Sequence, residues 1–203
     1  MSTYAFSKPT TAKATDKSQA LWDPAFRATL KDTGITTDSA SAPSNLSYAM
    51  NPPFGKRRSK WSNTFSATEA VLGNRGPQFK VGSGSAETIT WGLADTANGD
   101  IAAGKTSNTL LIHGGRQTWE GNIAYNDNHV NFETRPDPET SPFTFTGITT
   151  AGQKSQPDNL FVNENDSTRA VDTNLGTNSN NFLRNWTAIT QSGTNITLTP
   201  WYD

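Results

Sequence analysis

The chain has 203 residues, a formal net charge of −1 and no cysteine. Hydrophobic residues make up 33% and charged residues 17%, so uncharged polar side chains provide much of the solvation. The lack of cysteine excludes disulfides, thiolate nucleophiles and cysteine-ligated metal centres. The near-neutral charge provides no overall attraction for nucleic acid or anionic lipid, and no apolar run approaches the ~20 residues of a transmembrane helix. We therefore expect no nucleic-acid partner and no membrane insertion by this sequence.

The first part of the chain differs in composition from the rest. Residues 1–20 are rich in Ser, Thr, Ala and Lys, which predicts a flexible N-terminal arm, and residues 21–203 are expected to form a single β-rich domain. An aspartate N-cap followed by proline predicts a short helix over about 23–32. Ser66 and Glu69 have the spacing of a capping box, which predicts one further helical turn.

Most of the remaining sequence favours antiparallel strands, because apolar residues alternate with polar ones. Strands are expected over residues 46–50, 79–81, 89–91, 143–145 and 160–162. The apolar triplet at 110–112 predicts a strand buried on both faces. The Asn- and Thr-rich segment 163–181 predicts a surface loop that contributes little to the core. The expected fold class is α+β, a predominantly antiparallel β-sheet with one or two short helices and long loops.

The strongest local signal is a hairpin between residues 119 and 133. We predict a two-residue turn at Asp127-Asn128, because both residues tolerate a positive φ. This register places four apolar side chains on one packing face, namely Ile123, Tyr125, Val130 and Phe132. Asp127 and His129 are expected to order the turn, so these six residues form the predicted structural site.

No arrangement of residues predicts catalysis. His113 and His129 are the only histidines, and we expect both to fix turns by hydrogen bonds. The basic run at 56–60 is expected to be a solvated loop. The six tryptophans are scattered along the chain, which fits core and interface positions as well as a carbohydrate platform.

Segment 158–166 carries the oxygen-rich side chains that calcium prefers. A candidate calcium site would use four ligands, namely Asp158, Asn163, Asn165 and Asp166. The alternative is a metal-free loop of turns closed by Asn and Asp side chains. No other cofactor is expected.

The sequence His113-Gly114-Gly115 is followed closely by the hairpin Gly121–Phe132. This combination resembles the terminal hairpin of type IV pilin-like and type II secretion pseudopilin-like proteins of the planctomycete kind. Shorter similar pieces occur, in the same order, at 47–50, 74–77 and 158–162. Asn128 stands where the family has glycine, and the apolar N-terminal helix of pilins has no counterpart here. The resemblance therefore implies the globular head alone.

This resemblance implies a pilin-head-like fold and a non-enzymatic structural role in filament or secretion-apparatus assembly. The implied partners are copies of the chain itself or other pilin-like subunits, at the cell surface, in the periplasm or outside the cell. One alternative is a self-assembling extracellular tube, sheath or capsid subunit, which the Thr- and Asn-rich composition also fits. A second alternative is a carbohydrate- or calcium-binding β module.

Overall fold

The structure is a computed structural model, and it describes residues 47–95, 104–105, 107–111, 113, 117–192 and 195–200. These residues belong to one compact unit, residues 47–203. The predicted arm at 1–20 and the predicted helix at 23–32 lie outside the described residues. In the part of the chain that is described, no helix combines the length and the hydropathy needed to cross a membrane.

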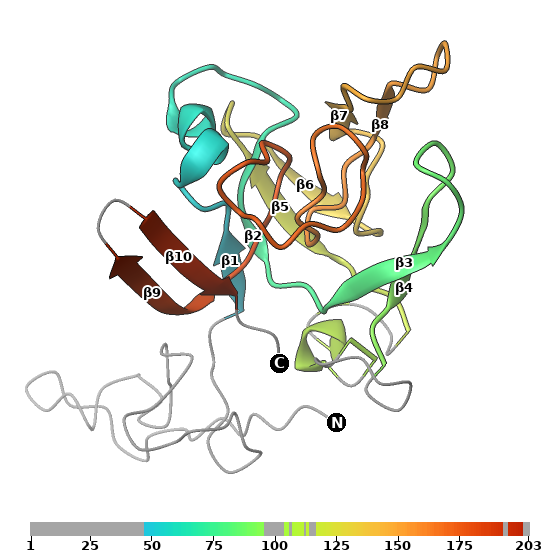
Figure 1. Cartoon of the computed structure of the whole chain (residues 1–203). Helices are drawn as coiled ribbons and strands as arrows, with labels where there is room; N and C mark the ends of the chain where they lie inside the picture. Colours follow the sequence, from blue (N-terminus) through green and yellow to red (C-terminus); the bar gives the residue numbers. More distant parts are fainter. Residues whose placement is uncertain are drawn as a thin grey trace, which may run out of the picture. The chain divides into compact units, whose positions relative to one another are not determined.

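A four-stranded antiparallel sheet lies at the centre of the unit (Figure 1). Its strands, in spatial order, are β1 (Tyr48–Met50), β2 (Ala70–Asn74), β5 (Gly121–Tyr125) and β6 (Val130–Glu133). Every neighbouring pair in this sheet is antiparallel. The expected dominance of antiparallel β-structure is confirmed.

Three two-stranded antiparallel hairpins accompany the sheet. They are β3–β4 (Phe79–Ser83, Thr90–Leu93), β7–β8 (Pro142–Thr144, Ser155–Pro157) and β9–β10 (Trp186–Ser192, Asn195–Pro200). Helical structure among the described residues is limited to two short 3-10 segments, η2 (Gly55–Trp61) and η4 (Asn108–Leu111). The α+β class with short helices, predicted from the sequence, is therefore confirmed.

The core lies against the inner face of the four-stranded sheet. Its buried apolar side chains are Ala49, Ala70, Phe79, Leu110, Trp119, Ile123, Tyr125, Leu160, Phe161, Val162 and Leu183. Phe161 stands at its centre, with the Trp119 ring edge-on at 4.6 Å and the Phe79 ring stacked at 6.1 Å. Such aromatic contacts add to the free energy gained by burying apolar surface.

Two predicted strands are wrong. Leu110 and Leu111 lie in the 3-10 segment η4, and Leu110 is buried there. Residues 160–162 form a turn, although all three side chains are buried. The side-chain oxygen of Asn159 accepts the N–H of Phe161 at 2.9 Å, and this local bond competes with strand pairing. At Leu110 and at residues 160–162, the apolar pattern indicated burial correctly but not backbone conformation.

The helical turn predicted at Ser66 is also wrong. The Ser66 hydroxyl does accept the Thr68 N–H, at 3.4 Å, but β2 begins two residues later at Ala70. Glu69 bonds the Thr64 hydroxyl at 3.0 Å instead of returning to the Ser66 backbone. The helical segment lies earlier, in η2, which contains the basic run that was expected to be a loop.

One edge of the sheet is closed by the segment that precedes β9. The Met50 N–H donates to the Arg184 carbonyl at 3.4 Å, and the Arg184 N–H donates back at 3.2 Å. The buried Arg184 guanidinium donates to the carbonyls of Gly76, Pro77 and Phe161 at 2.7–2.8 Å. Arg184 thus joins the β1 edge of the sheet to the buried turn at residues 160–162.

Candidate functional site

The β5–β6 hairpin has a three-residue connection, so the predicted two-residue turn is wrong. The Tyr125 N–H donates to the His129 carbonyl and the Asn128 N–H to the Tyr125 carbonyl, both at 3.0 Å. Asn128 has φ = +71°, the left-handed conformation that follows a type I turn in such loops. Ile123 therefore pairs with Asn131, and Ala124 with Val130.

This shift of one residue separates the four apolar residues that were predicted to share a face. Ile123 and Tyr125 are buried in the core, whereas Val130 is 60% and Phe132 50% exposed on the opposite face. Side chains alternate between faces along a strand, so a one-residue slip turns a whole strand over. The predicted single packing face is thus wrong, because two of its residues lie in the core and the other two on the exposed side of the sheet.

Asp127 and His129 bond each other within the turn. The Asp127 carboxylate accepts the His129 backbone N–H at 3.1 Å and also contacts its Nδ1. The bond from the His129 side chain lowers the pKa of Asp127 below its usual value. The His129 ring stacks on Tyr125 with centroids 4.5 Å apart. The other histidine, His113, lies edge-on against Phe132 at 5.4 Å.

The outer face of the four-stranded sheet carries a row of apolar side chains. Met50 pairs with Leu72, Leu72 with Ala124, and Ala124 with Val130, so the row crosses all four strands. Tyr48 and Phe132 extend the exposed apolar surface on the outer strands. The alternation in β1 was predicted, but its larger side chains, Tyr48 and Met50, face outward while Ala49 is buried. We call this surface the outer apolar face.

The edge of the sheet at β6 differs from the closed edge at β1. Tyr125 and His129 bond each other, so the alternation of an antiparallel ladder directs the N–H and C=O of Val130 and Phe132 away from β5. Within the described part of the chain, no backbone bond joins these groups to another segment. Among the residues that the structure describes, the β6 edge beside the outer apolar face is thus unpaired.

A second feature is a buried polar network, which corrects the prediction that 163–181 is a surface loop. Its centre is Arg57, whose side chain is fully buried. The guanidinium donates to the carbonyls of Asn180 and Leu175 at 2.7 and 3.0 Å, and to the side-chain oxygens of Asn163 and Asn180. Burial lowers the pKa of Arg57 to about 10, so it remains charged at neutral pH.

Two buried carboxylates belong to the same network. Asp158 accepts the Asn181 N–H at 2.6 Å and the Asn180 side-chain amide at 3.1 Å. Burial raises the pKa of Asp158 to about 6. Glu164 is paired with Arg169 at 3.2 Å, but burial, and then the charge of Asp158, raise its pKa well above the usual value.

The four predicted calcium ligands lie in this network and are hydrogen-bonded within the protein. Asn163 accepts from Arg57, and Asn165 accepts the N–H groups of Ser167 and Thr168 at 2.9 and 3.1 Å. Asp166 accepts the Ser179 N–H at 2.6 Å and pairs with Lys56 at 3.2 Å. Across the described ranges, no three acidic or histidine side chains are grouped to hold a metal ion. The calcium site stays an untested hypothesis, and Arg57 and Lys56 supply positive charge beside these oxygens.

Sequence patterns indicated the hairpin and the oxygen-rich segment but not the outer apolar face or the role of Arg57. Leu72 lies in a segment that was interpreted as helical, and Arg57 lies among exposed basic residues. No family model, no curated protein and no solved structure matches the chain.

Proposed function

We propose that the chain is a non-enzymatic structural subunit, a pilin- or pseudopilin-like head, that associates with further copies through the outer apolar face and the β6 edge. The observation that carries this proposal is the row Met50, Leu72, Ala124 and Val130, which crosses the sheet on its exposed side. The sequence resemblance to pilin-like heads supports the same role.

The exposed side chains provide the driving force for association. Leu72 on β2 and Val130 and Phe132 on β6 are 45–60% exposed, and Ala124 on β5 lies between them on the same face. Full burial of one such side chain contributes about 1.5–3 kcal/mol relative to full exposure, so partial burial of several is sufficient for a weak, specific contact. Contiguous apolar surface of this kind marks interaction sites on soluble proteins.

The β6 edge is complementary to itself. If two β6 strands pair antiparallel about a twofold axis at Asn131, Val130 of one copy lies opposite Phe132 of the other, and the reverse. The outward N–H and C=O groups of these residues would then bond across the axis, and both apolar faces would join. A β-branched side chain opposite an aromatic one is a favourable cross-strand pair.

The test is the mass of the full chain by sedimentation velocity and by size exclusion with light scattering. We expect the measured mass to rise with protein concentration. For a contact with a millimolar Kd, the concentration series should extend to about 1 mM. The double variant Val130→Lys and Phe132→Lys should be monomeric, because lysines at an edge strand oppose pairing. Val81→Lys is the matched control, because Val81 is 40% exposed on a different hairpin, β3. A wild-type monomer at all concentrations would refute the proposal.

Microscopy of the associated form separates this proposal from the tube, sheath or capsid alternative. The twofold contact described above closes on itself and yields discrete dimers. Unaided growth into tubes or shells requires contacts between different surfaces, and it would favour the alternative. If the lysine double variant also grew into tubes or shells, the contact between subunits would not be at the β6 edge.

A further inference from the structure

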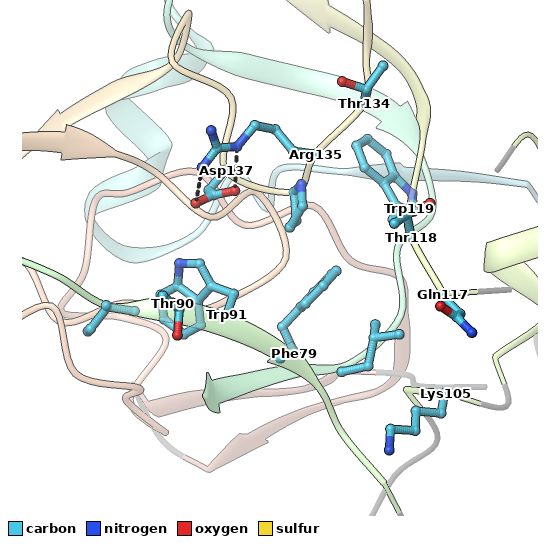
Figure 2. A pocket seen from close by; sticks show the side chains of 14 residues that line it. Phe79, Thr90, Trp91, Lys105, Gln117, Thr118, Trp119, Thr134, Arg135 and Asp137 are labelled. Atoms are coloured by element: carbon cyan, nitrogen blue, oxygen red, sulfur yellow. Dashed lines mark hydrogen bonds and ion pairs between the residues drawn. The ribbon is translucent and has the colours of Figure 1, made fainter. Parts of the chain in front are cut away.

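A cavity of about 770 Å³ opens between the β3–β4 hairpin and the segments 117–119 and 134–137. Figure 2 shows Trp91 and Phe79 on one side and the Arg135–Asp137 pair on the other. Its volume is within the range of small-molecule sites. The outer apolar face and the calcium candidates contribute no residue to this lining, so the inference is independent of the proposed function.

The apolar wall is held in place by contacts with the core. Phe79 stacks on Phe161, and the indole N–H of Trp119 donates to the Arg75 carbonyl at 2.7 Å. Val81 pairs with Trp91 across the hairpin, which fixes the backbone that carries the indole. The half-buried Trp91 therefore offers an aromatic surface on a preformed frame. Its indole N–H has no acceptor among the described residues.

The charged groups of the lining are compensated by neighbouring carboxylates. Arg135 donates to both oxygens of Asp137 at 2.9 Å, in the bidentate geometry that suits guanidinium and carboxylate. Lys105 is paired with Asp95 at 2.8 Å. A phosphate or carboxylate ligand would have to compete with these partners. The cavity thus presents little uncompensated charge.

The remaining polar side chains at the cavity are neutral. Gln117, Thr118 and Thr134 provide an amide and two hydroxyl groups, and all three are exposed. Each can both donate and accept hydrogen bonds. The lining thus combines an aromatic surface, neutral donors and acceptors, and paired charges.

We propose that this cavity binds a neutral saccharide. A sugar ring has an apolar C–H face, which packs on the electron-rich face of an indole. Its rim carries hydroxyls, which form hydrogen bonds with amide, hydroxyl and paired charged groups. Because both basic side chains already have carboxylate partners, uncharged sugars are favoured over uronic, sialylated or sulfated ones. Trp91 provides the stacking surface, and Gln117 and Thr118 provide hydrogen bonds at the rim.

The experiment applies the full chain to an array of neutral, sialylated, sulfated and uronic glycans, followed by titration calorimetry with the neutral glycan of highest signal. We expect binding to neutral glycans. Trp91→Ala should weaken it at least tenfold, whereas Trp91→Phe retains most of it. Trp61→Ala is the matched control, because this tryptophan is 43% exposed outside the cavity. Gln117→Trp, at an exposed rim position, should block the cavity without disturbing the core.

A further variant tests the charge argument. Asp137→Asn removes the carboxylate that holds Arg135, so it should add binding of acidic glycans that the unchanged chain lacks. Absence of binding to every neutral glycan, or binding of acidic glycans alone, would overturn the proposal. It would also fail if the blocking variant Gln117→Trp bound as tightly as the unchanged chain. Circular dichroism of each variant identifies a loss of folding, and Gln117→Trp keeps the test valid if Trp91→Ala does not fold.

Discussion

The guanidinium of Arg57 donates a hydrogen bond of 2.7 Å to the side-chain oxygen of Asn163, 106 residues further along the chain. It also bonds Leu175 and Asn180, so a single cation orders a long polar segment. This segment forms almost no regular secondary structure, and its order comes from bonds between side chains and backbone. In place of an apolar core, it has a buried charge surrounded by amide oxygens.

Arg57→Ala should therefore destabilise the protein strongly. Removing the guanidinium leaves the buried oxygens that it bonds without a donor and takes a positive charge away from the buried carboxylate of Asp158, and we expect a loss of about 3–5 kcal/mol. Urea unfolding followed by circular dichroism measures this change. Arg58→Ala is the control, because Arg58 is the exposed neighbour in the same 3-10 segment. A loss at Arg57 within the ±0.5 kcal/mol typical of surface positions would contradict this account.

Stability should fall as the pH rises from about 4 to 7, an interval set by the raised pKa of Asp158. The folded pKa of about 6 lies above that of the unfolded chain, so the folded state binds the extra proton. The contribution of the Asp158 proton to the unfolding free energy is complete below the pKa of Asp158 in the unfolded chain. It is lost as the pH rises through the pKa of Asp158 in the folded chain. One such proton changes the unfolding free energy by at most about 1.4 kcal/mol per pH unit.

The measurement is urea unfolding at several pH values in this interval. Asp158→Asn cannot titrate, so its stability should depend less on pH even though it loses a hydrogen bond to the Asn181 N–H. Equal slopes for the variant and the unchanged chain would assign the pH dependence to other groups, such as Glu164.

Asn128 tests the corrected hairpin turn. Its φ of +71° is unfavourable for a residue with an ordinary side chain, so Asn128→Ala should cost about 1 kcal/mol, whereas Asn128→Gly should be at least as stable as the unchanged chain. Thermal unfolding of both variants provides the comparison. If the turn had two residues and the predicted register, the exposed Phe132 would be buried, and Phe132→Ala would then be strongly destabilising. We expect only a small loss.

Gly76 tests the close approach of backbone to core. A Cβ atom at this position would lie 2.5 Å from ring carbons of Phe161, and that ring is itself in contact with Phe79, Trp119 and the Arg184 guanidinium. Gly76→Ala should destabilise the protein by about 1–3 kcal/mol through overpacking. At Gly92 the nearest atom to an added Cβ is 3.8 Å away, so Gly92→Ala is the control. Equal effects of the two substitutions in urea unfolding would disprove the proposed clash.

Calcium should leave the melting temperature unchanged. The side-chain oxygens of the four predicted ligands already accept internal hydrogen bonds, and the charge of Arg57 opposes a second cation nearby. The measurement is thermal unfolding in calcium chloride and in chelator. A rise of about 3 °C or more, roughly 1 kcal/mol for a domain of this size, would establish binding, and its loss in Asp166→Ala would locate the site.

Local patterns predicted strand positions well where a hairpin is closed by nearby residues. The β3–β4 pair joins the two predicted strand segments, and Val81 lies opposite Trp91. The β5–β6 hairpin was also predicted, but its register depended on whether Asn126 belongs to the strand or to the turn. Asn126 is held by Lys60 and Ser62 through its side-chain amide, at 2.8 and 2.9 Å, and no local pattern contains that information.

The polar segment shows why burial was misjudged. Asn163 and Asn180 are buried because Arg57 and Asp158, which lie outside the segment, supply their partners. Amide side chains without such partners would remain in water, which is the expectation that composition supports. The cavity beside Trp91 was likewise beyond prediction, because its walls come from segments that are far apart in the sequence.

The position of Arg184 has a consequence for synthesis of the chain. Its backbone closes the edge of β1, and its guanidinium holds carbonyls of residues 76, 77 and 161. A nascent chain on the ribosome can pair β1, β2, β5 and β6 as soon as residue 133 has emerged. It cannot seal the sheet until more than fifty further residues have left the exit tunnel. During that interval the unprotected β1 edge is available to other nascent chains, and cellular chaperones would have to shield it.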